Sequence, residues 1–195
     1  MLDAPDRASI KTLAALRDAE ARCVRCLLYK SATQVVPGEG RLRARLMLVG
    51  EQPGDKEDLA GKPFVGPAGR ILDRALEQAG IARDDVFVTT PSSTSSTRCA
   101  ASGACTSGRT PTRSSAAGCG SNMSAVALGA TAARSVLRRG GTIGQLRARA
   151  HVLEDDTSVF VTIHPSFLLR IKDESDQDRE FRMFVVDLRR AKGRI

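Results

Sequence analysis

Two loops in the sequence combine residue types that bind polar ligands. Glycines, carboxylates and one aromatic residue lie within 50–70, directly after the apolar run 46–49. A second apolar run, 159–163, leads into a histidine, a proline and a serine at 164–166. Open α/β sheets bind ligands at the carboxyl ends of their strands. The two loops therefore predict one polar site to which carboxylates and a histidine contribute.

Apolar runs alternate with segments of helical spacing along the chain. Strands are expected over 46–49, 86–89 and 158–163, and helices over 8–22, 67–79, 130–137 and 177–191. Gly80 can cap the helix that ends at residue 79. Strands alternating with helices predict an α/β fold, a three-layer α/β/α arrangement with a central parallel sheet. A length of 195 residues fits a single domain over 1–195. No motif surrounds His151, which is expected at the surface.

The composition indicates a polyanionic partner. Thirty Lys and Arg against 22 Asp and Glu give a formal net charge of +8. Neutralised phosphates release counterions, which favours nucleic acid, although a basic protein without such a role has the same balance. No apolar run approaches the roughly 18 residues of a membrane helix. The first residues lack the cationic-then-apolar order of a secretory signal, so a cytoplasmic location is expected.

The order of residues in the two loops resembles a known family. The first loop reads GEQPGDKEDLAGKPFVGPAGR over 50–70, and the second reads HPSFLLR over 164–170. Together they resemble the family-4 uracil-DNA glycosylases, and within them the UdgX-type branch. The resemblance implies hydrolysis of the N-glycosidic bond of a flipped-out deoxyuridine in base excision repair. It also implies the uracil-DNA glycosylase superfamily fold, a monomer, and binding to both single- and double-stranded DNA containing uracil.

The resemblance assigns roles to most polar residues of the loops. The residues expected in catalysis are Glu51, Gln52 and His164. The residues expected around the uracil are Gly50, Gln52, Asp55, Phe64, Thr90 and His164. The residues expected to contact DNA are Pro53, Gly54, Lys56, Gly66, Gly69, Arg70, Ser166, Leu168 and Arg170. Taken singly, the first loop could be an ordinary glycine-rich turn and the histidine a structural residue; the complete strings favour the functional roles.

Chemical reasons accompany these roles. The departing base carries negative charge, which His164 can stabilise by donating a hydrogen bond to uracil O2. Phe64 is expected to stack on the ring, and Leu168 or Leu169 to enter the stack that the flipped base leaves. The glycines at the start of a helix are expected to offer free backbone N–H groups to phosphate.

The cysteines point to a structural cluster. The resemblance makes Cys23 and Cys26 two ligands of a 4Fe–4S cluster, and thiolates suit such clusters. The CxxC spacing alone fits zinc or an accidental pair equally well. Cys119 lies nearest to the position of a further family ligand.

Residues 90–122 depart from the family pattern. They contain no Leu, Ile, Val or Phe, a composition typical of a disordered loop. The nucleotide string AACGCCGTCAAGCACTTCAAGT encodes the family motif NAVKHFK from its first base and the residues at 90–96 from its second. Because the same offset converts 102–108 into the basic motif KRRMHKR, we hypothesise a shifted reading frame across this segment.

This departure predicts impaired activity. Thr90 stands where the family has an asparagine that reads uracil, and a hydroxyl replaces an amide poorly in such pairing. No histidine lies between 90 and 122, so the covalent attachment to DNA that is typical of the branch is not expected. The segment 126–130 lacks the apolar strand that the family has at this point, so the sheet is expected to be missing an inner strand.

Two other functions are compatible with parts of the sequence. A non-catalytic, uracil-DNA-binding iron–sulfur protein would bind uracil-containing strands without producing abasic sites. A nucleotide-binding Rossmann-like domain is the weaker alternative, since no G-x-G-x-x-G follows a strand.

Overall fold

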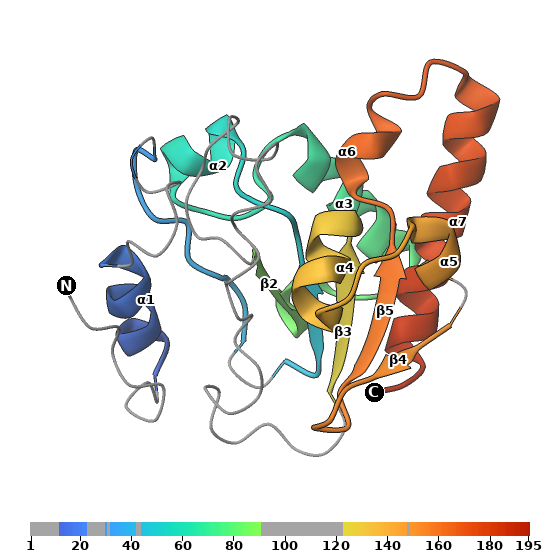
Figure 1. Ribbon diagram of the computed structural model, residues 1–195. Coiled ribbons are helices and arrows are strands. Elements are labelled where there is room, and N and C mark those ends of the chain that lie inside the picture. The colour runs from blue at the N-terminus through green and yellow to red at the C-terminus, as the bar shows by residue number, and fades with distance from the viewer. Residues whose placement is uncertain (1–11, 23–29, 31, 42–43, 91–122, 148) are drawn as a thin grey trace.

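A five-stranded sheet forms the centre of the molecule (Figure 1). The computed structural model describes residues 12–22, 30, 32–41, 44–90, 123–147 and 149–195. The strands are β1 (Leu46–Val49), β2 (Val86–Thr89), β3 (Ser124–Leu128), β4 (His151–Val152) and β5 (Ser158–Thr162). Their order is β2-β1-β3-β5-β4, and all neighbours are parallel except the β4–β5 pair. The predicted parallel sheet is confirmed, with one antiparallel edge strand added.

Helices cover both faces of the sheet, which confirms the three-layer prediction (Figure 1). Alternate residues of a strand point to opposite faces. Leu46 and Leu48 thus pack towards α3 (Pro67–Gln78) and α7 (Glu174–Lys192), whereas Val49 packs towards α4 (Ala130–Leu137) and α5 (Ile143–Arg147). Among the described residues, no helix has the length and apolar content of a membrane span.

The prediction of a missing inner strand is wrong. β3 occupies the centre of the sheet, with Ser124 opposite Leu46 on one side and Ser158 on the other. All five of its residues are buried. The run Ser-Ala-Val-Ala-Leu is poor in the branched residues typical of strands. Its small side chains fit because Ala132 and Ala133 of α4 pack closely on this face.

The prediction that His151 lies at the surface is also wrong. Its side chain is 6% exposed, on the short edge strand β4. Nδ1 lies 2.5 Å from Arg139 Nη2, and Nε2 lies 2.9 Å from the carbonyl oxygen of Leu146. Because a guanidinium can only donate, Nδ1 accepts and Nε2 donates. Local sequence gives no sign of this burial, since both partners come from other elements.

Most predicted element bounds agree with the structure to within three residues. The strands at 46–49 and 86–89 and the helix at 130–137 are reproduced, and α7 begins three residues earlier than expected. α1 (Leu13–Ala21) starts at Thr12, whose hydroxyl accepts a hydrogen bond from the Ala15 N–H. Gly80 ends α3 in the left-handed region at φ +69°, as predicted. Three short helices, α2 (Asp55–Ala60), α5 (Ile143–Arg147) and α6 (Pro165–Leu168), were not predicted.

The start of α3 is packed unusually closely against the loop before it. Phe64 adopts φ 56°, which is uncommon for a residue with a side chain. A Cβ atom on Gly69 would lie only 1.7 Å from the Phe64 carbonyl oxygen. Gly69 is therefore required for the close approach that fixes the Phe64 backbone.

Substitution of this glycine tests the packing. Gly69→Ala should lower the free energy of unfolding by about 2–3 kcal/mol, because the backbone of the loop must move away. Gly144→Ala is the matched control, since Gly144 lies in α5 with no atom within 4 Å of an added Cβ. The control should be neutral or stabilise by about 0.5–1 kcal/mol. Urea denaturation measures both, and equal stability of the two variants would contradict the role of Gly69.

Candidate functional site

The candidate site lies at the carboxyl ends of β1, β3 and β5. The chain leaves β1 towards β2 on one side and later enters β3 on the other, so a topological switch point separates β1 from β3. Glu51 follows β1, and Thr131 Oγ1 at the start of α4 donates a hydrogen bond to its Oε1 at 3.0 Å. Gly129, at the end of β3, lies against His164, with an added Cβ only 3.1 Å from the histidine Cβ. The structure thus brings the two predicted loops together.

Phe64 forms an apolar wall of this site. An added Cβ on Gly50 would lie 2.7 Å from Phe64 Cζ, so the absence of a side chain there lets the ring lie against the end of β1. The ring centroids of Phe64 and His164 are 5.9 Å apart, with the planes inclined at 31°. Phe64 is 9% exposed. An aromatic face and an imidazole therefore share one small region at the strand ends.

The hydrogen bonds of His164 define its tautomer. Nδ1 accepts a hydrogen bond from the Ser166 backbone N–H at 3.2 Å and lies 2.8 Å from Ser166 Oγ. A backbone N–H can only donate, so Nδ1 carries no proton and the neutral ring carries its proton on Nε2. Burial lowers the pKa of His164 below its ordinary value of 6.5; Glu51 and Glu57 raise it, and Arg170 lowers it further. His164 is thus a neutral hydrogen-bond donor at neutral pH.

Glu57 joins two helix starts. Its Oε1 accepts the Gly66 N–H at 2.8 Å, and its Oε2 accepts the Gly54 N–H at 3.2 Å. Gly66 and Gly54 precede the first residues of α3 and α2. The sequence predicts a free Gly66 N–H for phosphate, but a carboxylate of the protein accepts from this group. Glu57 has no role in the sequence-based prediction, although its place three residues after Gly54 is that of a capping residue.

Asp58 is a second overlooked carboxylate, and its role is structural. It is 6% exposed and accepts the backbone N–H of Thr33 through both oxygens, at 3.1 Å and 3.0 Å. It also accepts the Gln34 N–H at 3.4 Å. Asp58 thus attaches α2 to the segment that precedes β1.

The predicted DNA contacts divide into exposed and buried residues. The exposed ones are Gly54, Lys56, Arg70 and Arg170, and Ser166 is partly buried. The buried ones are Pro53, Gly66, Gly69 and Leu168. Leu168 is 1% exposed and packs in the core, so the prediction that it contacts DNA is wrong for this conformation. Phe167 and Leu169, its neighbours, are 45% and 51% exposed.

The remaining predicted site residues lie around the same strand ends. Thr90 is buried, with its Cγ2 3.3 Å from the position of an added Cβ on Gly50. It therefore lies beside the Phe64 ring, where the sequence predicted a residue that reads uracil. Gln52 is partly buried, and Asp55 is exposed at the first residue of α2. A carboxylate at this position is stabilised by the helix dipole.

The predicted cluster ligands lie outside the described residues. Cys23, Cys26 and Cys119 belong to segments that the structure does not describe, as does the atypical stretch 91–122. Within the described residues, no group of three His, Cys, Asp or Glu side chains is arranged to hold a metal ion.

Comparisons with known proteins agree with this geometry. The profile of the Uracil DNA glycosylase superfamily matches residues 37–189. The Type-4 uracil-DNA glycosylase of Thermotoga maritima is 35% identical over 187 residues, which cover 89% of this chain and 90% of that protein. The Type-4 enzymes of Saccharolobus solfataricus and Pyrobaculum aerophilum are 45% and 51% identical over 75 and 67 residues, about a third of each chain. With one relative matched along almost its entire length and a site at the expected strand ends, the chain belongs to the uracil-DNA glycosylase superfamily, as a family-4 member.

Proposed function

We propose that this protein removes uracil from DNA by hydrolysing the N-glycosidic bond of a flipped-out deoxyuridine. One observation carries the proposal: the Phe64 ring and the neutral His164, whose proton is on Nε2, lie together at the carboxyl ends of the strands. An aromatic face suits a stacked base, and a fixed N–H donor suits an oxygen on which negative charge develops. We also propose that the protein belongs to the UdgX-type branch of family 4.

The residues take complementary parts in the reaction. Water attacks C1′ of the sugar, the bond from C1′ to N1 breaks, and the uracil departs with the bonding electron pair. His164 stabilises the negative charge on uracil O2. The Glu51 carboxylate, held by Thr131, orients the water and faces the positive sugar. Gln52, Asp55 and Thr90 contact the base. Lys56, Arg70, Ser166 and Arg170 contact the DNA strand, and Leu169 takes the wedge position.

We expect the DNA substrate, the cellular location and the cofactor to be those of the family. Uracil-containing DNA, single- or double-stranded, is the partner, and the protein acts as a cytoplasmic monomer. Cys23, Cys26 and Cys119 would hold a structural 4Fe–4S cluster, since thiolates are the donors that such clusters require. The cluster supplies no step of the chemistry. Thr90 in place of an amide favours the second candidate, binding to uracil-DNA without excision.

Excision is tested with an end-labelled oligonucleotide containing one uracil, treated with hot alkali after incubation. The unaltered protein should cleave it, and His164→Gln should slow single-turnover excision about 100-fold or more, the usual effect of losing one charge-stabilising donor. Phe64→Ala should weaken binding about tenfold or more through lost stacking. Leu169→Ala should slow the reaction, whereas Met183→Ala, equally exposed on α7, should not.

The outcomes separate the two candidates. Unchanged excision by His164→Gln and Phe64→Ala would refute the assigned roles. An intact oligonucleotide, retained by the protein more strongly than a uracil-free strand, would establish the binding protein instead. If the oligonucleotide is neither cleaved nor preferentially retained, both candidate functions are contradicted.

The pH dependence of excision follows from the lowered pKa of His164. Because the pKa lies below 6.5, the neutral donor persists as the pH falls through 6.5, and single-turnover excision should decline only at lower pH. Arg170→Gln removes a nearby positive charge, so the pKa should rise and the acid limb move to higher pH. Lys56→Gln, which also removes an exposed cation of the DNA face, should leave the limb unchanged. Coincident acid limbs for the Arg170 and Lys56 variants would contradict this assignment.

Iron content tests the cluster independently of activity. Anaerobically purified protein should contain about four irons per chain with visible absorption. Cys23→Ser should lose most of the iron, because one thiolate ligand is removed. Cys105→Ser, which changes a cysteine outside the predicted ligand set, should retain it. Less than about one iron per chain in the unaltered protein, or equal loss in both variants, would disprove the ligand assignment.

A further inference from the structure

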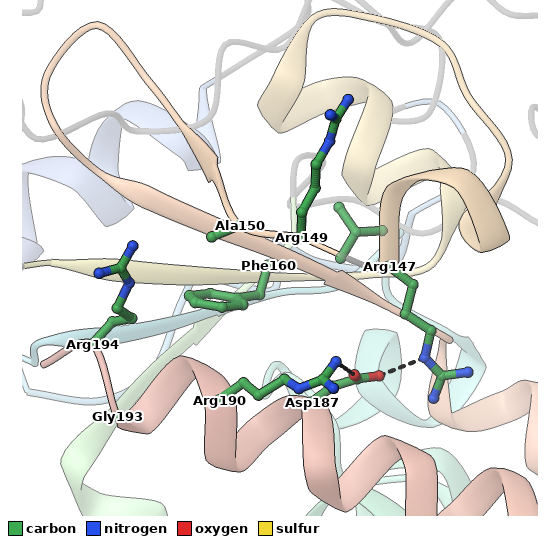
Figure 2. A pocket seen from close by; sticks show the side chains of 9 residues that line it. Arg147, Arg149, Ala150, Phe160, Asp187, Arg190, Gly193 and Arg194 are labelled. Carbon is green, nitrogen blue, oxygen red and sulfur yellow. Dashed lines mark hydrogen bonds and ion pairs between the residues drawn. The ribbon is translucent and has the colours of Figure 1, made fainter.

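A cavity lies between β5 and the end of α7, apart from the site at the strand ends that holds Phe64 and His164 (the base site). Its volume is about 230 Å³. The residues that line it are Arg147, Arg149, Ala150, Phe160, Val161, Asp187, Arg190, Gly193 and Arg194. Figure 2 shows the Phe160 ring on the side of β5 that faces α7, with Arg194 beyond one end of the ring and the Arg190–Asp187 pair beyond the other. The Arg149 side chain extends to the opposite side of the strand.

Positive charge exceeds negative charge around this cavity. Four arginines and a single carboxylate line it. Asp187 Oδ2 is already used twice, by Arg147 Nε at 2.5 Å and by Thr162 Oγ1 at 2.6 Å. Arg147 also donates to Glu180 at 3.0 Å, so its charge is matched by two acids. The carboxylates of Asp187 and Glu180 therefore mainly neutralise the charge of Arg147.

The two arginines of the C-terminal segment have weak partners or none. Arg190 Nη1 lies 3.7 Å from Asp187 Oδ1, beyond hydrogen-bond distance, and its side chain is 58% exposed. Within the described part of the chain, no ion pair or side-chain hydrogen bond involves Arg194. Both guanidiniums are thus available to an anion at the rim of the cavity.

The cavity also has an apolar floor. Phe160 and Ala150, both partly buried, contribute carbon surface. An aromatic face stacks with a nucleobase, and guanidiniums bind phosphate through paired hydrogen bonds. The volume is slightly below the roughly 300 Å³ at which pockets for drug-sized ligands begin, which limits the ligand to a small one.

We propose that this cavity binds a nucleoside phosphate, with the base on Phe160 and the phosphate on Arg194, while Arg190 adds positive charge at the other end of the ring. The nucleoside phosphate is either a free nucleotide or the phosphorylated end of a DNA strand. The site is distinct from the base site, since it shares no residue with the loops at 50–70 and 164–170.

Calorimetric titration of the full chain tests the proposal with three probes: AMP, inorganic phosphate and a 5′-phosphorylated, uracil-free dinucleotide. AMP should saturate one site. Arg190→Ala combined with Arg194→Ala should weaken AMP binding about tenfold or more, because one charge-assisted contact and a neighbouring positive charge are lost. Arg179→Ala combined with Arg182→Ala removes the same charge from exposed positions of α7 and should change affinity less than about twofold.

Two further variants distinguish the parts of the ligand and the location of the site. Phe160→Leu keeps an apolar side chain, so it should weaken AMP binding and leave phosphate binding unchanged. Phe64→Ala alters the base site and should leave AMP binding intact. Thermal unfolding midpoints confirm that each variant is folded.

Each outcome has a defined meaning. Saturable binding of AMP supports a free nucleotide, and binding of the dinucleotide alone supports a strand end. No saturation by either probe overturns the proposal, as does an equal loss in the Arg179 and Arg182 control. Loss of binding in Phe64→Ala would assign the nucleotide to the base site, and phosphate binding as tightly as AMP would refute the role of Phe160.

Discussion

The close approach of the Phe64 backbone to Gly69 is the constraint on which the site depends. It holds Phe64 at a positive φ, and the ring is thereby directed to the ends of the strands. Gly50 leaves room for the ring on one side, and His164 limits it on the other. Because three chain segments meet within contact distance, a shift in any of them displaces the aromatic wall. The Phe64 loop is held in place because Gly50 and Gly69 have no side chains and allow close packing, rather than because additional contacts are made.

The polar groups of the site already have partners within the protein or are kept neutral by burial. Glu57 accepts one N–H group at the start of each of the helices α2 and α3. Burial keeps His164 neutral although two carboxylates act on it. The cations that remain for a polyanion are exposed side chains such as Lys56 and Arg170. Long exposed side chains can adjust to the backbone of a flexible DNA strand, whereas the residues of the base site are held in place before DNA binds.

Sequence analysis predicted the layers, the main strands and the meeting of the two loops, because these depend on local patterns of apolar residues and on family motifs. It failed where tertiary packing decided the outcome. The small residues of β3 make a central strand only because α4 packs tightly on them. His151 is buried by contacts with Arg139 and with the carbonyl oxygen of Leu146, which the periodicity of the sequence does not indicate, and Leu168 is directed inwards by the turn of α6. Glu57 was overlooked because its two acceptor contacts span a loop whose path the sequence does not reveal.

The end of α7 also donates hydrogen bonds to the end of α3, which is distant in the sequence. Arg189 donates to the carbonyl oxygen of Gln78 at 2.6 Å, and Lys192 donates to that of Gly80 at 2.6 Å, across sequence separations of 111 and 112 residues. These are the last carbonyls of the helix that begins beside Phe64. During synthesis, the ribosome releases α3 long before either cation exists, and β3 and β5 also emerge late. Folding of α7 onto the sheet therefore adds the last contacts to the helix that begins beside Phe64.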